Sequence, residues 1–153
     1  MFIDSQEIFS AAQNCFASGA DVNSTNIIDL APHLAANAAW PGDEGPGEEA
    51  TIFAQINTAV TGGTSLQPVL QTDTNTNFAT ALAEFPLCAA VPVATLVAGY
   101  VFPKFRIPAS GLKRYLRIAW RNVGANAAGT ATAQIVKDPQ NSPIQAGSGF
   151  VVG

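Results

Sequence analysis

The densest group of carboxylates in this sequence consists of Asp43, Glu44, Glu48 and Glu49. Carboxylate oxygens are suitable ligands for a hard cation such as calcium, and a pair of carboxylates can hydrolyse glycosides when both are held rigidly across a cleft. The Gly and Pro residues between these carboxylates match no calcium-loop spacing, and a loop of this composition is a poor rigid support. The pattern therefore favours a solvated acidic loop over a metal or catalytic site.

Other residue types that perform catalysis are isolated in the chain. The single histidine, His33, has no Cys or carboxylate at metal-ligand spacing. Ser148 lies in a Gly-rich tail without the strand-to-helix turn of a hydrolase nucleophile. The run from Gly62 to Thr64 has no Lys to meet a phosphate and is typical of a turn. We therefore expect no enzymatic activity, no metal and no cofactor.

Four basic residues fall on the outward faces of predicted strands: Lys104, Arg106, Arg117 and Arg121. Cations beside aromatic residues, here Tyr100 and Tyr115, are one means of holding single-stranded nucleic acid. The ten carboxylates that precede Lys104 would repel a polyanion, so we expect no nucleic-acid partner. The simpler interpretation is that these cations are solvated and that some pair with carboxylates on neighbouring strands, for at most ~1 kcal/mol each.

Aromatic residues suggest a different kind of site, because Trp and Tyr rings can stack on sugars. Trp40 is the only aromatic residue in a loop with nearby carboxylates, an arrangement that suits a sugar site. Tyr100, Tyr115 and Trp120 are the other candidates. Trp120, however, falls on the same side of its predicted strand as apolar residues that are expected to face the core. The sequence therefore also predicts, as one alternative function, a carbohydrate-binding β-sandwich with Trp40 as its stacking residue.

Charge is divided unevenly along the chain. All seven Lys and Arg residues lie between Lys104 and Lys137, whereas ten of the eleven Asp and Glu residues precede Lys104. Only 12% of the residues are charged, which is about half the usual share. The surface must therefore consist mainly of Thr, Asn, Gln, Ser and Ala, and we expect other subunits or a partner to cover part of it.

Hydrophobic patterning predicts many short strands. Segments rich in β-branched or aromatic residues, separated by Gly, Pro or Asn clusters, occur at 27–30, 51–60, 66–72, 85–93, 100–107, 115–123 and 130–136. Such a series in 153 residues is typical of an all-β sandwich with a single core. We expect one β-sandwich domain over 1–137, in which 1–25 form an N-terminal arm and the first strand region, followed by a C-terminal tail over 138–153.

Alternation within the clearest strand predicts which side chains face the core. Leu116, Ile118 and Trp120 lie on one side of this strand and should form a dry face, that is, a face buried against the core. Arg117 and Arg121 lie on the opposite side, which should face solvent.

The segment 100–107 shows a similar alternation. It predicts that Val101, Phe105 and Ile107 point inward and that the basic side chains of the segment point outward. Pro103 cannot donate a ladder hydrogen bond, which predicts an edge or bulged strand.

Helical signals are weak. A capping box of Asp4 with Glu7 allows a short N-terminal helix, although the segment from Phe9 could equally be an extended arm. One helical turn is possible over 77–84. The irregular segment 33–49 is long enough to suggest a purpose such as reaching a neighbouring molecule.

Two distant cysteines, Cys15 and Cys88, form no disulfide framework, so we expect both to be free. The N-terminus lacks the basic start and apolar core of a signal peptide. The longest apolar stretch, 87–102, is interrupted and shorter than the ~20 residues that a helix needs to cross a bilayer. We therefore expect a soluble chain that is made inside the cell and has no membrane partner.

Six segments carry a family resemblance through their order and spacing: 9–13, 24–30, 70–73 with Phe78, 105–108, 114–117 and 133–136. In this order they resemble the capsid cement, or decoration, proteins of short-tailed tailed phages of the Bordetella podophage type. The resemblance spans most of the chain. It departs from the family pattern in the longer loop 33–49, which contains Trp40, and in the tail 138–153, so contact details and oligomeric state stay open.

The resemblance implies a jelly-roll-like antiparallel β-sandwich of about eight strands. It further implies a homo-oligomer, dimer or trimer, that binds the outside of the assembled capsid and joins neighbouring major capsid subunits. The protein would thus be made in the host cytoplasm and act on the outer surface of the virion, without catalysis or a cofactor.

The residues themselves suggest how such a contact would form. Our hypothesis is that the capsid presents an acidic surface to Lys104, Arg106, Arg117 and Arg121. If the two strands that carry these residues are neighbours, they form one basic patch. If a crossover separates the strands, the cations form two rows.

Overall fold

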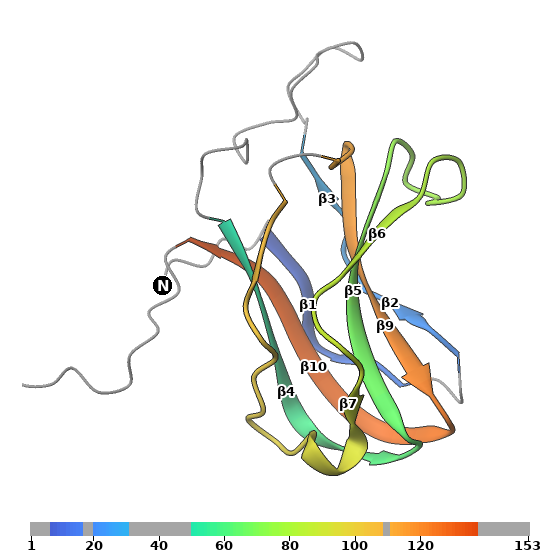
Figure 1. The fold of residues 1–153 in the computed structure, drawn as a ribbon, viewed down its shortest axis with the longest axis vertical. Coiled ribbons are helices and arrows are strands. Elements are labelled where there is room, and N and C mark those ends of the chain that lie inside the picture. Colours follow the sequence, from blue (N-terminus) through green and yellow to red (C-terminus); the bar gives the residue numbers. More distant parts are fainter. Residues whose placement is uncertain (1–6, 17–19, 31–49, 109–110, 138–153) are drawn as a thin grey trace, which may run out of the picture.

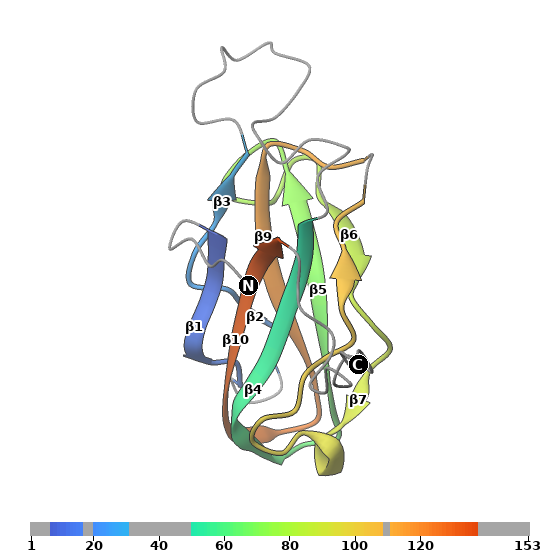
Figure 2. The same ribbon diagram turned by 90° about the vertical axis from the view of Figure 1, so that its left-hand side faces the viewer.

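The computed structural model describes residues 7–16, 20–30, 50–108 and 111–137. These residues form two antiparallel β-sheets that lie face to face, as the perpendicular views in Figure 1 and Figure 2 show. The four-stranded sheet has the order β1-β10-β4-β8. The six-stranded sheet has the order β2-β9-β5-β6, with β3 also paired to β9 and β7 also paired to β5. The predicted all-β sandwich is thus confirmed.

The strands are short at the edges of the sheets and long in their centres. Their bounds are β1 Ile8–Asn14, β2 Val22–Asn23, β3 Ile28–Asp29, β4 Ala50–Gly62, β5 Ser65–Asp73, β6 Ala83–Pro86, β7 Val91–Pro92, β8 Phe105–Arg106, β9 Tyr115–Val123 and β10 Asn126–Lys137. A 3₁₀ turn, η2, covers Val93–Thr95.

Successive parts of the chain alternate between the two sheets. β1, β4, β8 and β10 belong to the four-stranded sheet, and the strands between them in the sequence belong to the six-stranded sheet. Consecutive strands such as β4 and β5, or β9 and β10, therefore lie in opposite sheets, whereas β5 and β6 pair side by side within one sheet. The narrower jelly-roll form stays a prediction, which this alternation supports.

The core lies between the two sheets and confirms the predicted dry face of β9. Leu116, Ile118 and Trp120 all have 0% exposure. The opposing sheet contributes alternate residues of β4 and β10, namely Ile52, Ala54, Ile56, Ala131, Ala133 and Ile135. Period-2 alternation along antiparallel strands explains this core, because every second side chain faces the other sheet.

The predicted edge strand at 100–107 is present, but most of it is irregular. Its backbone follows the edge of β4, since the N–H of Phe102 donates to the carbonyl of Ala54 and the N–H of Ile107 donates to the carbonyl of Ala50. Only β8 within it forms a continuous ladder. The position of β8 at the end of the sheet order confirms the edge location that Pro103 predicted.

The predicted orientation of side chains in this segment is partly wrong. Phe105 and Ile107 pack against the core as expected. Val101, however, is 42% exposed, and its neighbour Phe102 is 1% exposed. The alternation is interrupted around Pro103, so the inward positions before and after it are out of phase with each other.

Other boundaries differ from the sequence predictions. The predicted strand 85–93 is divided into β6 and β7, because residues 87–90 leave the ladder between Pro86 and Val91. The possible helical turn at 77–84 is wrong, since this region contains turns, bends and the start of β6. Asp4 lies outside the described residues, and the chain from Ile8 to Asn14 forms strand β1 rather than a helix.

Glycine residues make the connections between the sheets at one end of the sandwich. The predicted turn at 62–64 joins β4 to β5, and Gly62 and Gly63 have φ angles of 73° and 67°. A Cβ atom on Gly63 would lie 1.3 Å from Oδ1 of Asn126 at the start of β10. This turn thus requires glycine both for its left-handed backbone and for its contact with Asn126.

Both cysteines are free, as predicted. Cys15 is buried, and burial raises the pKa of its thiol to about 12. Burial also raises the pKa of the Cys88 thiol. In the described part of the chain, no helix has the length and hydropathy that crossing a bilayer requires.

Candidate functional site

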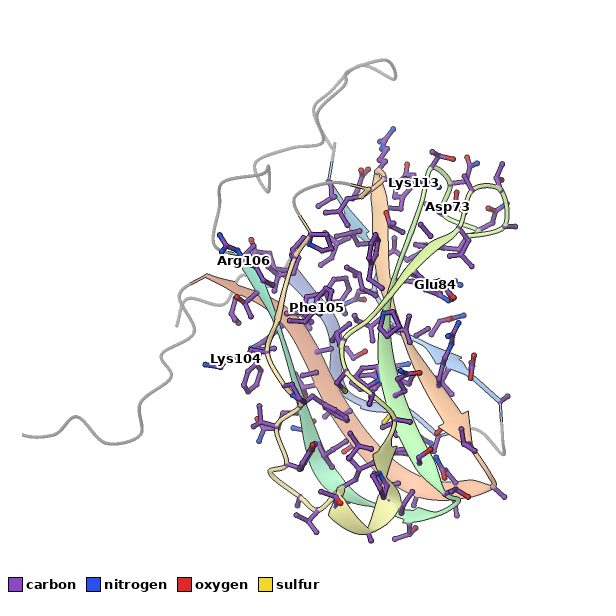
Figure 3. The ribbon with its side chains drawn as sticks, viewed as in Figure 1. Asp73, Glu84, Lys104, Phe105, Arg106 and Lys113 are labelled. Atoms are coloured by element: carbon purple, nitrogen blue, oxygen red, sulfur yellow. The ribbon has the colours of Figure 1, made fainter. Side chains whose placement is uncertain are left out.

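Lys104 and Arg106, which we call the basic rim, lie on the exposed edge of the four-stranded sheet. Figure 3 shows both side chains directed away from the sandwich on the side of β4, whereas Phe105 between them points toward the interior. Both basic residues are exposed. Charged side chains and proline on an edge strand hinder pairing with the edge of another sheet, so Pro103 and the basic rim favour side-chain contacts over strand addition here.

The outer face of the four-stranded sheet, next to the basic rim, is uncharged. This neutral face consists of outward side chains of β4 and β10: Thr51, Phe53, Gln55, Asn57, Thr58, Thr130 and Thr132. The sequences 50–62 and 126–136 contain no charged residue. The neutral face is continuous with the basic rim, because Thr51 of β4 pairs with Arg106 of β8.

Hydrogen bonds between side chains fix part of the neutral face. Thr132 Oγ1 donates to Asn57 Oδ1 over 2.7 Å and accepts from the backbone N–H of Ala12 over 3.0 Å, so one hydroxyl connects three strands. Thr130 Oγ1 donates to Thr58 Oγ1 over 3.0 Å. These polar groups are already ordered before any partner binds, which lowers the entropy cost of a contact at this face.

Arg117 and Arg121 lie elsewhere, on the outer face of the six-stranded sheet, where they contact other side chains of the same chain. Arg121 donates to both carboxylate oxygens of Glu84 over 2.7 Å, and it lies 3.7 Å from Asp21. Arg117 donates to Gln71 Oε1 over 2.6 Å. Gln71 in turn donates to Glu84 over 2.7 Å. The two arginines are therefore partners of an internal network, as the simpler interpretation of the sequence anticipated.

The electrostatics of this network agree with its geometry. Burial acts to raise the pKa of Glu84, but hydrogen bonds from Gln71 and Arg121, together with the charges of Arg121 and Arg117, lower it overall. Burial lowers the pKa of Arg117, and the charges of Asp73 and Glu84 partly oppose this. The guanidinium of Arg117 also lies over the ring of Phe78, 4.1 Å from its centroid.

The four basic residues that were predicted to bind the capsid thus form two separate groups rather than one patch. The basic rim belongs to the edge of the four-stranded sheet, and the two arginines belong to the outer face of the other sheet. In Figure 3 the labelled rim residues and Glu84, the partner of Arg121, lie on opposite sides of the molecule. Of the two groups, the basic rim is the one that borders the neutral face.

The loop between β5 and β6 is organised around Asp73, which the sequence analysis did not single out. One carboxylate oxygen accepts from the N–H of Asn75 over 3.1 Å, and the other accepts from the N–H of Ala81 over 3.0 Å. The Asp and Asn residues within 73–77 could have indicated this turn from the sequence, because their side chains commonly accept hydrogen bonds from the backbone of their own turn.

Three of the aromatic candidates for sugar stacking are engaged within the chain or lie in the core. Trp120 is in the core, as its parity predicted. Tyr100 packs edge-on against Phe102, with 5.2 Å between ring centroids, and the guanidinium of Arg114 lies 5.0 Å from the centroid of the Tyr115 ring. Trp40 lies outside the described residues, so the sugar-binding alternative stays a prediction.

Within the ranges that the structure describes, no three His, Cys, Asp or Glu residues are grouped so that they could hold a metal ion. His33, Ser148 and the acidic group at 43–49 lie outside these ranges, as does the tail 138–153, so the division of the chain into domain and tail stays a prediction.

The chain matches no protein-family model, and no sequence among curated proteins matches it.

Proposed function

We propose that this chain is a structural capsid decoration protein. It binds the outside of an assembled phage capsid, as a homo-oligomer, and joins neighbouring major capsid subunits there. The observation that carries this proposal is the neutral face bordered by the basic rim, on a β-sandwich whose sequence segments resemble those of cement proteins.

The neutral face suits a large and permanent contact. Burying a charge without a partner is costly, whereas a surface of Thr, Asn and Gln that satisfies part of its own hydrogen bonds carries no such penalty. A stable protein contact buries about 1,600 Å² in total, an area that a sheet face rather than a single loop can supply.

The basic rim would orient the partner in this contact. Exposed cations at the border of an interface mainly steer approach and fix orientation, and they add less to affinity than the buried centre does. An acidic surface on the capsid subunit would complement Lys104 and Arg106. Arg117 and Arg121 are assigned no capsid contact in this proposal, because they lie on the outer face of the other sheet, where they contact Glu84, Gln71 and Phe78.

Decoration of this kind stabilises a shell by mass action. A protein that binds the assembled shell and not the separate subunits shifts the equilibrium toward the shell. The mechanism requires no catalytic residue and no cofactor, only a contact surface that two capsid subunits share.

The proposal is tested by co-sedimentation of the purified chain with shells assembled from a phage major capsid protein. We expect saturable binding that weakens as salt concentration rises, because salt screens exposed charges. The double variant Lys104→Gln/Arg106→Gln should bind at least about tenfold more weakly, equivalent to 1.4 kcal/mol, and should show a smaller salt dependence.

The matched control is Arg117→Gln/Arg121→Gln, which removes the same charge from the other sheet and should bind as the unaltered chain does. Absence of binding by the unaltered chain would contradict the decoration function itself. Equal losses in the two double variants would contradict only the assignment of the contact to the basic rim.

A further inference from the structure

Val136 is buried although it lies on the outer face of the four-stranded sheet. Ala133 and Ile135 of β10 belong to the core. The residues that alternate with them, Thr132, Gln134 and Val136, therefore face outward. Val136 has 0% exposure and Gln134 has 6% exposure, yet Val136 is not part of the core cluster. Thr132, on the same face, is only half-buried.

The neighbouring strands do not account for this burial. Figure 2 shows β10 between β1 and β4, and no described strand lies in front of it. Thr132 is flanked by both strands, since its hydroxyl accepts from the N–H of Ala12 in β1 and its backbone pairs with β4. Val136 pairs with Thr51 of β4, whereas β1 begins at Ile8, opposite Gln134. Strand neighbours alone would thus leave Val136 more exposed than Thr132, and the opposite is observed.

The surface around Val136 is apolar. Ile8 of β1 and Phe53 of β4 both pair with Gln134 and therefore lie on its face of the sheet. Both side chains are half-buried, and neither belongs to the core cluster or packs against it. We call Ile8, Phe53 and Val136 the apolar end of the outer face. Such a surface favours an apolar cover, because water is released when apolar groups meet.

Three segments outside the described ranges join the four-stranded sheet at this end. They are 1–6 before β1, 31–49 before β4 and 138–153 after β10. The six residues before β4 include three glutamates, and the six residues after β10 are Asp, Gln, Asn, Ser and two prolines. Met1, Phe2 and Ile3, in contrast, precede Ile8 by only five to seven residues. Among the three segments, 1–6 thus has the apolar side chains nearest to its attachment.

The length of this segment suits the apolar end. Six extended residues span at most about 20 Å, and adjacent strands are about 4.8 Å apart. A segment that turns back at Ile8 can therefore cross β10 and reach β4. The same short length keeps it near the sheet to which it is attached.

We propose that the segment 1–6 docks on the apolar end of its own four-stranded sheet, with Phe2 and Ile3 over Val136. This inference does not rest on the proposed decoration function. The docked segment covers only the end of the neutral face that contains Phe53. The polar part of that face, next to Thr132, stays open to a partner.

The test measures how fast a thiol at position 136 reacts with a maleimide. Val136→Cys is made in a Cys88→Ser chain, whose remaining native thiol, Cys15, is buried. A covered thiol reacts slowly, so position 136 should be protected in this chain. Adding Phe2→Ser/Ile3→Ser should raise the labelling rate at least about tenfold, because a polar segment no longer stays on an apolar surface.

Two controls match this experiment in position and in chemistry. Thr58→Cys places a thiol at an exposed position of the same sheet face, and its labelling rate should not change when Phe2→Ser/Ile3→Ser is added. Phe150→Ser/Val151→Ser makes equivalent substitutions in the C-terminal segment and should leave Val136→Cys protected. Circular dichroism should show that every variant retains the β-sandwich.

Unchanged protection of Val136→Cys in the Phe2→Ser/Ile3→Ser chain would overturn the proposal. Loss of protection in Phe150→Ser/Val151→Ser would assign the cover to the C-terminal segment instead, and loss of protection on dilution would assign it to a second copy of the chain. Both outcomes also overturn the proposal. None of these measurements uses capsid shells, so their failure leaves the decoration function standing.

Discussion

Asp73 shows how one side chain can determine the shape of a polar loop. Burial acts to raise the pKa of its carboxyl group, but backbone hydrogen bonds from Ala81, Asn75 and Thr74, with one more from the Thr74 hydroxyl, lower the pKa overall. The folded state therefore favours the ionised carboxylate. Its contribution to stability is fully present above the pKa of the unfolded chain, near 3.8, and is lost as pH falls through the lower pKa of the folded state.

Replacing Asp73 with Asn should lower the melting temperature at pH 7. An amide has only one acceptor oxygen, so its NH₂ group would face the N–H of Ala81 or of Asn75. The unaltered chain should lose stability below about pH 4, and Asp73→Asn should lose less over the same range. Thermal unfolding followed by circular dichroism between pH 7 and pH 3 measures both effects.

Asp21→Asn is the matched control, because Asp21 is exposed and its contact with Arg121 is a 3.7 Å surface ion pair. Such pairs contribute about 0–1 kcal/mol, so this variant should melt close to the unaltered chain. If Asp73→Asn shows the full acid-dependent loss of the unaltered chain, the assignment of that loss to Asp73 is wrong.

At the level of elements, the connections between the sheets depend on close backbone approach. Gly63, between β4 and β5, contacts Asn126 of β10. A Cβ atom added to Gly124, between β9 and β10, would lie 3.0 Å from Thr64. The two connections thus pack against each other at the same end of the sandwich. Asn126 is buried and also donates to Asn122 Oδ1 over 2.6 Å, which ties this end to β9.

Gly63→Ala should therefore be more destabilising than Gly99→Ala. Both glycines have positive φ, so both substitutions introduce left-handed strain of roughly 1–2 kcal/mol. A Cβ atom at Gly99 meets nothing within 4 Å, whereas at Gly63 it would overlap Asn126. We expect an additional loss of about 1–3 kcal/mol in the free energy of unfolding for Gly63→Ala, measured by urea titration. Equal losses in the two variants would show that Asn126 moves aside freely.

Alternation along a strand predicted side-chain orientation correctly in a central strand but not in an edge segment. The alternation in β9 correctly predicted its core face, because β9 is a regular central strand paired on both sides. In the edge segment, Val101 was assigned to the wrong side, because a strand with one partner tolerates a break at Pro103. Within 1–25 the sequence predicted a strand region without bounds for β1 and β2, because short edge elements carry little periodic signal.

At the scale of the whole molecule, the division of charge along the sequence does not become a division in space. Among the described residues, three ion pairs join a carboxylate of the first 103 residues to an arginine beyond them: Asp29 with Arg114, and both Asp21 and Glu84 with Arg121. Each sheet contains strands from both parts of the chain. The acidic and basic parts are thus interleaved in one sandwich rather than separated into two units.

This interleaving predicts a single cooperative unfolding transition. Neither part of the chain can retain its core when the other unfolds, because each sheet would lose its central strands. In Trp40→Phe, fluorescence reports the buried Trp120 alone. Its urea transition should coincide with that of far-ultraviolet circular dichroism, and two separated transitions would contradict the single-domain interpretation.

The sequence by itself determined the all-β class, the dry face of β9, the edge position of Pro103 and the turn at 62–64. These properties depend on local periodicity and on backbone restrictions, which neighbouring residues impose directly. The tertiary structure alone decided that Arg117 and Arg121 are held by Glu84 and Gln71, and that the basic rim borders an uncharged sheet face. Such outcomes depend on strand order, which brings distant segments together and which no local pattern specifies.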